Sequence, residues 1–416
     1  MLSVADALNL ILQQVQEGTS EPVPLNQGLS RILSGSLTVP NDSPPFDKAL
    51  MDGFAVVVDQ TPQQTPPTES AFLKFDVCET ITAGQTPSIA LRPGVAARIM
   101  TGAVLPEGCN CVVPIEQTQF DETRPETVTI AASVMFPDAN LMRRGTAAKA
   151  GSVLLPAGTR LQPQQIAALA EFGYSSLNVR RKSRVAVLAT GDELIAVDQP
   201  LTAGKIRNSN EPMLLAQIEA SGAIPISLGI ARDNESALRA GIEEGLKHDF
   251  LLLTGGVSAG ILDLVPKQLT AAGVKELFHG VHMKPGKPLW FGQRDRDESR
   301  CLVFGLPGNP VSSLTCYELF VRPAVVKHSG ARIPAPQLIA ILTDRVSVKG
   351  NRPVYQPVFV SLESGSLTAR PVPWSGSSDL RATVDANGMA LMLPDRKSYE
   401  TGDRVDVWLW GDQRLI

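Results

Sequence analysis

The sequence contains no uninterrupted run of 18 apolar residues, which is about the shortest length that a membrane-spanning helix needs. Its first residues also lack the basic, then apolar, then small-residue pattern of a secretory signal. The formal net charge is only −4, so there is no general excess of positive charge for nucleic acid or an anionic membrane. We therefore expect a cytoplasmic protein that binds neither nucleic acid nor membrane, and any positive site must be local.

Cysteine and histidine are also scarce, with five and four residues respectively. An odd number of cysteines in a chain of 416 residues argues against a disulfide framework. Cys109 and Cys111 have no second pair and no nearby histidine, whereas a zinc site usually needs four ligands with paired spacing. Buried or inert thiols are the better interpretation, and the scattered histidines favour structural or surface roles.

Glycine and proline, by contrast, are abundant, and the length of the chain predicts two to four domains. Strand-like and helical segments alternate from residue 184 to 325, which predicts a three-layer, mostly parallel α/β domain. Short strand-like segments predict a small β domain within 56–134 and a β-barrel or sandwich at the C-terminal end. Outside these regions, the apolar spacing predicts a helix at 4–16. A short helix is expected at 25–33 after a proline-containing link, and another at 163–172, which a proline begins and Gly173 ends.

The stretch from Phe250 to Pro310 carries three glycine-rich turns where strands meet helices. An apolar run typical of a buried strand ends in Thr254-Gly255-Gly256, and two further turns follow, Lys284-Pro-Gly-Lys287 and Gly305-Leu-Pro-Gly-Asn-Pro310. Open α/β sheets bind ligands at such junctions. Free backbone N–H groups favour phosphate or other oxyanions, and the two lysines add positive charge. This stretch therefore predicts an anion site, although the lysines taken alone could belong to a solvated hairpin.

Seven motifs in order resemble one family. They are Pro-Pro-Phe-Asp47 with Asp52-Gly-Phe-Ala55, Met100-Thr-Gly-Ala103, Thr190-Gly-Asp-Glu-Leu194, Asn208-Ser-Asn210, Thr254-Gly-Gly-Val-Ser258, Lys284-Pro-Gly-Lys-Pro288 and Gly305-Leu-Pro-Gly-Asn-Pro310. Together they are similar to the molybdopterin molybdenumtransferase family, which comprises the MoeA proteins and the E domain of gephyrin. The resemblance covers nearly the whole chain.

The resemblance implies a four-part subunit in an elongated homodimer, with an α/β domain similar to the pterin-adenylylating MogA fold. The expected parts are a helical and extended linking domain at 1–45 and 143–182, a small β domain at 46–142, the α/β domain at 183–328 and a C-terminal β-barrel at 329–416.

The resemblance also implies a reaction in molybdenum cofactor biosynthesis. The family takes adenylylated molybdopterin and molybdate, releases AMP and places molybdenum on the pterin dithiolene, with a divalent cation such as Mg²⁺. A molybdopterin adenylyltransferase is a possible partner protein. A site that holds both phosphate and a tetrahedral oxyanion is also what the glycine-rich turns predict.

The family's site residues match named positions of this chain. Expected catalytic carboxylates are Asp52, Glu193, Asp233 and Asp263, of which Glu193 and Asp263 are candidate Mg²⁺ ligands because carboxylates are hard oxygen donors. Expected contacts with the substrate or the oxyanion are Thr101, Arg144, Ser258, Lys284, Lys287, Pro288 and Ser377.

Simpler structural roles compete for three of these carboxylates. Asp52 with Gly53 could form a hairpin turn. Glu193, with Asp192 before it, could cap a helix after its strand. Asp233 could cap the helix that follows it.

The chain also departs from the family pattern. Ala147 stands where an acidic residue usually follows Arg143-Arg144-Gly145, and Pro357 stands where the C-terminal domain typically offers an arginine for molybdate. Arg352 and Arg381 are nearby in sequence. Two other functions therefore stay open, a pterin adenylyltransferase that uses ATP and a diverged pterin-binding or scaffold protein without turnover. The choice between molybdate and tungstate is open as well.

Overall fold

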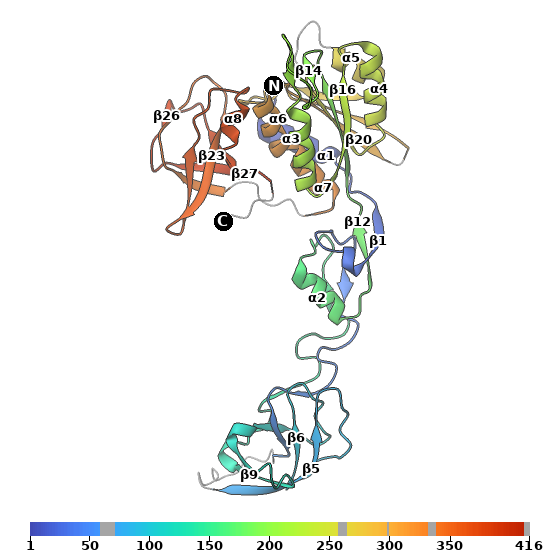
Figure 1. The fold of residues 1–416 in the computed structure, drawn as a ribbon, viewed down its shortest axis with the longest axis vertical. Helices are drawn as coiled ribbons and strands as arrows, with labels where there is room; N and C mark the ends of the chain where they lie inside the picture. The colour runs from blue at the N-terminus through green and yellow to red at the C-terminus, as the bar shows by residue number, and fades with distance from the viewer. Residues whose placement is uncertain (59–70, 257–263, 298, 332–337, 412–416) are drawn as a thin grey trace. The chain divides into compact units, whose positions relative to one another are not determined.

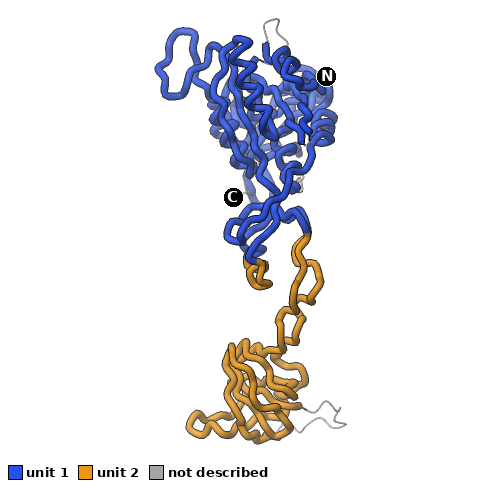
Figure 2. The backbone as a smooth tube through the Cα atoms, turned by 90° about the vertical axis from the view of Figure 1, so that its right-hand side faces the viewer, with its two compact units in different colours: residues 1–35, 157–166, 175–416 blue, residues 36–156, 167–174 orange. Residues whose placement is uncertain are grey.

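The computed structural model describes residues 1–58, 71–256, 264–297, 299–331 and 338–411, which form two compact units (Figure 2). Unit 1 comprises residues 1–35, 157–166 and 175–416, and unit 2 comprises residues 36–156 and 167–174. Within the described residues, the longest apolar helix falls short of what crossing a membrane requires.

Unit 1 contains a six-stranded sheet in the order β16-β13-β17-β20-β19-β18 (Figure 1). Its strands are β13 (Arg184–Thr190), β16 (Ile224–Ala231), β17 (Phe250–Thr254), β18 (Lys275–His279), β19 (Trp290–Asp295) and β20 (Arg300–Leu306). The first four strands of the order are parallel, and β19 and β18 are antiparallel to their neighbours. The predicted mostly parallel α/β domain is confirmed.

Helices cover both faces of this sheet because the side chains of the strands alternate between two cores. Phe250 and Leu252 of β17 belong to one core, and Leu251 and Leu253 belong to the other. The first core takes side chains from α1 (Val4–Gln14), α3 (Asn210–Ala220) and α6 (Pro310–Cys316), whereas α4 (Glu235–Gly245) and α5 (Leu264–Ala271) cover the second. The sheet and its two helical layers give the predicted three-layer arrangement.

A long helical segment follows β20. The last helical segment of the predicted α/β region, which ends at residue 325, is present as α6, a π-helical turn η4 (Tyr317–Val321) and α7 (Arg322–His328). Glu318 in the π-helical turn accepts hydrogen bonds from Gln217 and Arg322, so this buried carboxylate is paired.

The C-terminal strands close into a barrel in the order β21-β24-β23-β25-β27, so the barrel rather than the sandwich is confirmed. Its elements are β21 (Leu338–Leu342), β23 (Val354–Glu363), β24 (Ser366–Pro371), β25 (Gly388–Met392) and β27 (Arg404–Leu409), with the short helix α8 (Leu380–Thr383) between β24 and β25. Inward-facing residues such as Val358, Ala390 and Val407 are fully buried in its core.

Unit 2 contains a second six-stranded sheet in the order β7-β4-β6-β5-β9-β8. Its strands are β4 (Gly53–Val56), β5 (Phe72–Ile81), β6 (Val95–Ile99), β7 (Cys111–Pro114), β8 (Thr118–Phe120) and β9 (Thr127–Ala131). Gly53 lies so close to β7 that an added Cβ would stand 1.9 Å from the carbonyl oxygen of Val113. Because β4 pairs with β6 and β7 across the sheet, the alternative that Asp52-Gly53 forms a hairpin turn is wrong.

Short elements complete the chain. They are β1 (Ser20–Pro24) with β12 (Ser176–Arg180), β2 (Leu37–Thr38) with β11 (Val153–Leu155), β3 (Lys48–Ala49) with β10 (Leu141–Met142), β14 (Leu194–Ile195) with β15 (Ile206–Arg207), β22 (Val346–Ser347) with β26 (Ser398–Tyr399), the helix α2 (Pro163–Glu171), and the 3₁₀ turns η1 (Leu25–Gln27), η2 (Ile115–Gln117) and η3 (Ala132–Val134).

The predicted helix at 25–33 is wrong, because only η1 forms there. Ser30 adopts a left-handed backbone with φ +63, which an α-helix cannot contain. Ile32 and Leu33 then pair as isolated bridges with Arg160 and Val179. Pairing with residues distant in the sequence therefore takes the place of the expected helix.

All five cysteines are free, as predicted, and only Cys78 is partly exposed. Burial raises the pKa of the Cys109 thiol to about 11, which keeps it protonated and unreactive.

Candidate functional site

One edge of the unit 1 sheet collects the predicted motifs. The parallel strands β16, β13, β17 and β20 all end there, and β19 begins there because Trp290 pairs with Gly305 at the end of β20. We call it the carboxyl edge. The turn from Lys284 to Lys287 precedes β19, so this turn lies at the same edge as the loop from Gly305 to Pro310.

The lysine turn is held by the barrel on one side and by buried sulfur atoms on the other. The amide of Lys284 donates to the carbonyl of Pro353, and the amide of Tyr355 donates to the carbonyl of Lys284, both at 2.8 Å. Gly286 has φ +108 and packs against Cys316 and Met283. The backbone of the turn is therefore fixed by its surroundings.

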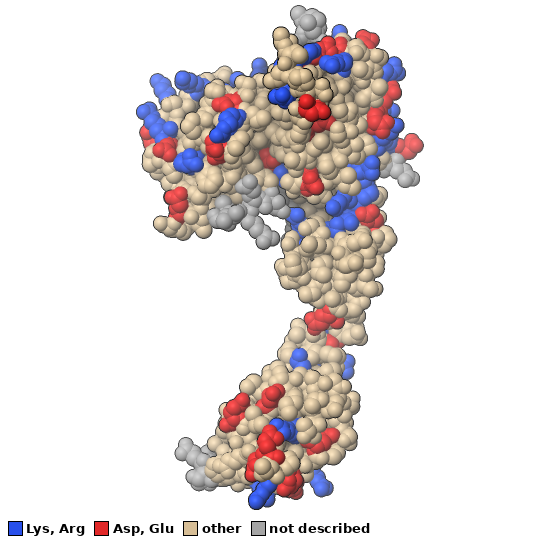
Figure 3. All heavy atoms as spheres, viewed as in Figure 1, with Lys and Arg blue, Asp and Glu red and all other residues tan. Residues whose placement is uncertain are grey.

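The two lysine side chains remain available to a ligand. Lys284 is half-buried and Lys287 is exposed. Neither ammonium group has an acidic partner within 4.0 Å in the part of the chain that the structure describes. Two unpaired cations on a fixed turn form a local positive site. On the face shown in Figure 3, both units carry positive as well as negative side chains.

Ser377 of the barrel joins this edge through Asn309, a residue that the sequence analysis did not assign. The Asn309 side-chain amide donates to Ser377 Oγ at 2.9 Å, and the amide of Val311 donates to the Ser377 carbonyl at 3.1 Å. Asn309 is the N-cap residue of α6, but its side chain makes no capping bond. The sequence could have pointed to Asn309, because it is a polar residue between Gly308 and a proline, at a position where a helix cap is expected.

Asn210 links three loops of the carboxyl edge. Its side-chain amide donates to Thr254 Oγ1 at 2.8 Å and to the carbonyl of Gly308 at 2.7 Å, and the residue is buried. The Asn208-Ser-Asn210 motif was recognised, but its role was not. The contacts show that Asn210 ties the start of α3 to the ends of β17 and β20.

The predicted carboxylates Glu193 and Asp233 lie on neighbouring loops after β13 and β16. The amide of Asp192 donates to Asp233 Oδ2, and the amide of Asp233 donates to Asp192 Oδ1, both at 3.3 Å. Glu193 and Asp233 are exposed. Both capping alternatives are wrong, because a strand rather than a helix follows Glu193, and because Asn234 caps α4 by accepting from Ala237.

Asp52 and Thr101 form a pair in unit 2. Asp52 Oδ1 accepts from the Thr101 hydroxyl at 2.6 Å and from the Thr101 amide at 2.7 Å. These two hydrogen bonds, with that of the hydroxyl first, lower the pKa of the Asp52 carboxyl. The pair connects residues 49 apart in sequence, so Asp52 does not merely stabilise its own turn.

Arg144 also belongs to unit 2. Its Nε donates to Asp42 at 2.8 Å, and its side chain is 65% exposed. Its two terminal nitrogens make no hydrogen bond with any described residue. Arg143, in contrast, pairs with both Asp47 and Asp138, and each of its three side-chain nitrogens donates a hydrogen bond within the protein. Of the two arginines, Arg144 is the one with donors left for an anion.

The predicted site residues therefore fall into separate groups. Unit 1 holds Glu193, Asp233, Lys284, Lys287, Pro288 and Ser377, and unit 2 holds Asp52, Thr101 and Arg144. Ser258 and Asp263 lie outside the described residues.

The structure separates the two arginines near Pro357. Arg352 is half-buried and donates from Nη1 to the carbonyl of Met283 at 3.0 Å, beside the lysine turn. Arg381 lies on α8, where it pairs with Asp385 at 2.9 Å. Sequence distance alone could not distinguish them.

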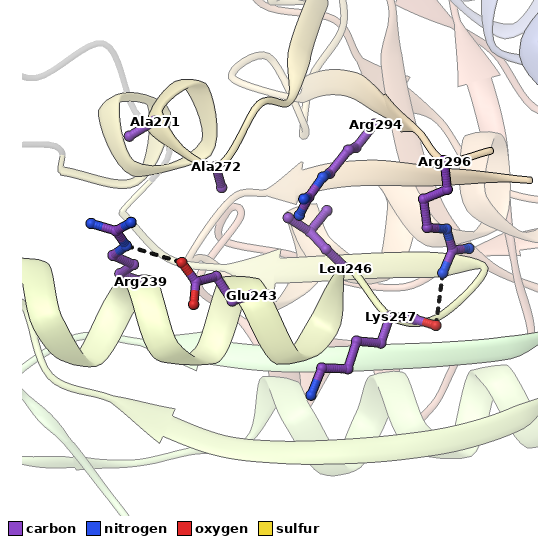
Figure 4. A pocket seen from close by; sticks show the side chains of 8 residues that line it. All are labelled: Arg239, Glu243, Leu246, Lys247, Ala271, Ala272, Arg294 and Arg296. Atoms are coloured by element: carbon purple, nitrogen blue, oxygen red, sulfur yellow. Dashed lines mark hydrogen bonds and ion pairs between the residues drawn. The ribbon is translucent and has the colours of Figure 1, made fainter.

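A pocket of about 610 Å³ lies away from these residues, between the C-terminal ends of α4 and α5 and the end of β19 (Figure 4). Arg296 there donates to the carbonyls of Lys247 and His248, and Arg239 pairs with Glu243. Positive side chains at helix C-termini neutralise the helix dipole. These residues are accounted for by structure, and we assign no ligand to this pocket.

The chain matches known families and proteins along almost all of its length. Residues 2–173 match the MoeA N-terminal region (domain I and II), residues 186–327 match a probable molybdopterin binding domain, and residues 340–410 match the MoeA C-terminal region (domain IV). A molybdopterin molybdenumtransferase of Bacillus subtilis is 36% identical, over 98% of this chain and 94% of that protein. One from Staphylococcus epidermidis is 34% identical, over 98% and 95%.

A solved structure agrees with these matches. The crystal structure of a molybdopterin biosynthesis MoeA protein from Pyrococcus horikoshii OT3 superimposes with a TM-score of 0.82 at 28% identity, over 99% of this chain and all of that one. The three matched regions occur in the same order as the sequence motifs, and they include the lysine turn and Ser377. The chain therefore belongs to the molybdopterin molybdenumtransferase family.

Proposed function

We propose that this enzyme inserts molybdenum from molybdate into adenylylated molybdopterin and releases AMP. The observation that carries the proposal is the turn from Lys284 to Lys287, which has two unpaired cations and lies at the same carboxyl edge as the Asn309–Ser377 contact with the barrel. Such an edge suits an oxyanion because it offers both positive charge and hydrogen-bond donors.

Hydrogen bonding supports a donor role for Ser377. The Asn309 amide donates to Ser377 Oγ, so it occupies a lone pair of that oxygen and leaves the hydroxyl proton free. The proton can then be donated to an oxygen of molybdate. Lys284 and Lys287 would offset the dianionic charge, and Pro288 would hold the exit of their turn.

Glu193 and Asp233 are proposed to act on the phosphate bridge, together with Ser258 and Asp263, which lie between β17 and α5 in the sequence. No cluster of three or more potential ligands occurs among the described His, Cys, Asp and Glu residues. Mg²⁺ nevertheless fits this donor set, because it commonly binds through one or two carboxylates together with phosphate oxygens and water. Glu193 and Asp263 would hold it, and the bound ion would neutralise the pyrophosphate charge.

From unit 2, Arg144 is proposed to bind a phosphate, because its terminal nitrogens are unused by the protein. Asp52 and Thr101, which pair within unit 2, are proposed to contact the substrate as well. We further propose a cytoplasmic homodimer that receives its substrate from a molybdopterin adenylyltransferase.

The test is AMP release from adenylylated molybdopterin, measured with and without molybdate in the presence of Mg²⁺. We expect molybdate-dependent release by the wild type and a loss of about tenfold or more in Lys287→Ala, because a hydrogen bond to a charged group contributes about 1.5–3 kcal/mol. Lys275→Ala is the matched control, because Lys275 is exposed and pairs with Gln293 away from the carboxyl edge.

Other outcomes would contradict the proposal. Formation of adenylylated pterin from ATP, with no molybdate-dependent AMP release, would identify an adenylyltransferase. Tight binding of the pterin nucleotide without any AMP release would identify a binding or scaffold protein, the alternative that Ala147 and Pro357 raised.

A further inference from the structure

One barrel side chain reaches the lysine turn. Arg352, two residues before β23, donates from Nη1 to the carbonyl of Met283 at 3.0 Å. The next residue of the turn, Lys284, is bound on both sides by the barrel backbone through Pro353 and Tyr355. The guanidinium of Arg352 is therefore held beside the first lysine of the turn.

We propose that Arg352 is a third cationic contact for the tetrahedral oxyanion, in addition to Lys284 and Lys287. The inference rests on the proposed function. A guanidinium has five N–H donors, and the carbonyl of Met283 is the only acceptor that the described residues provide for Arg352. The remaining donors form a planar fork that can bind two oxygens of one anion.

The charge balance of the junction supports this role. Lys284 and Lys287 belong to the turn, and Arg352 binds the carbonyl of the residue just before it. None of the three side chains has a carboxylate partner within the described residues. Arg352 and Lys284 are half-buried, so water screens their mutual repulsion less than it would on an open surface. An anion bound between the domains would relieve that repulsion, which is the physical reason to expect one.

A purely structural role is the competing explanation. In that case Arg352 only fastens the barrel to the turn, and its loss would lower stability without a selective effect on molybdate. The two explanations differ in which Michaelis constant changes.

The test compares Arg352→Gln, Arg352→Lys and Arg381→Gln. Arg381 is the matched control, because it belongs to the same domain but is 73% exposed and paired with Asp385. The KM for molybdate and the KM for adenylylated molybdopterin are measured from AMP release, and binding of sodium molybdate alone is measured by calorimetry. Melting temperatures show whether each variant is folded.

We expect Arg352→Gln to raise the KM and the Kd for molybdate about ten- to a hundredfold, with the KM for the pterin nucleotide within about twofold of the wild type. Arg352→Lys should lie between, because it keeps the charge and loses the fork. Arg381→Gln should match the wild type.

Two results would overturn the inference. One is a Kd for molybdate that differs by less than about threefold between Arg352→Gln and the wild type. The other is an equal loss for both substrates accompanied by a lower melting temperature in both Arg352 variants. A wild type that binds molybdate through Arg352 but releases no AMP would refute the proposed reaction and leave this contact standing.

Discussion

Replacement of Gly286 by alanine tests whether the lysine turn is fixed from beneath. Gly286 has φ +108, which L residues rarely adopt, and an added Cβ would lie 2.7 Å from Cys316 Sγ and 3.0 Å from Met283 Cε. Cys316 and Met283 are fully buried, so neither side chain can move into solvent. The methyl group must therefore displace either the turn or the core.

Two costs add in this variant. An unfavourable backbone conformation costs about 1–3 kcal/mol. Overpacking a close-packed core typically costs a further 1–3 kcal/mol or so. We therefore expect Gly286→Ala to lower the free energy of unfolding of unit 1 by about 2–6 kcal/mol.

Tryptophan fluorescence in urea measures this change selectively, because Trp290, Trp374, Trp408 and Trp410 all belong to unit 1. Gly402→Ala is the matched control, since Gly402 has φ +94 but no atom within 4 Å of its added Cβ. Gly402→Ala should lower the free energy of unfolding by the backbone cost alone. The additional loss that comes from overpacking should be smaller when Gly286→Ala is made in a Cys316→Ala background.

The reasoning would be refuted if Gly286→Ala destabilised unit 1 no more than Gly402→Ala does. It would also be refuted if the Cys316→Ala background left the cost of Gly286→Ala unchanged. If the turn moves as expected, the KM for molybdate should rise in the same variant, since both lysines flank the displaced residue.

Two further predictions concern the Asn309–Ser377 contact and the buried His328. Asn309→Ala and Ser377→Ala should each raise the KM for molybdate. The KM of the double variant should be no higher than that of the more impaired single variant, because Asn309 acts through Ser377. Additive effects on KM would show that Asn309 acts independently of Ser377. Burial lowers the pKa of His328, which also contacts Ser183 and faces Asp249. The unfolded imidazole therefore takes up its proton first, and stability should fall as pH drops below about 6.5; urea unfolding at pH 7.5 and 5.5 should show a smaller loss in His328→Gln, and an equal loss would contradict the assignment.

Much of the fold follows from local patterns. The apolar run at Phe250 predicts a buried strand because such a composition is stable only when both faces are covered. Alternation of strands and helices then implies a parallel sheet, and the glycine-rich turns must collect at its carboxyl ends. The motif order added the family, and with it Lys284, Lys287 and Ser377.

Local patterns failed where distant segments compete. The helix expected at 25–33 is replaced by pairing of Ile32 and Leu33 with Arg160 and Val179, which satisfies the same backbone groups. In the sequence, Asp52 with Gly53 is typical of a turn. In the structure, the Asp52 carboxylate accepts a hydrogen bond from the hydroxyl of Thr101, which lies just after β6.

The sequence by itself determined the order of the elements, the family and the identity of the cations that an oxyanion would require. Only the tertiary structure decided which polar side chains meet, because hydrogen bonds form between neighbours in space whatever their separation along the chain. Asn309 reaches Ser377 across 68 residues, and Arg352 rather than Arg381 reaches the lysine turn, because the barrel places β23 and not α8 against that turn.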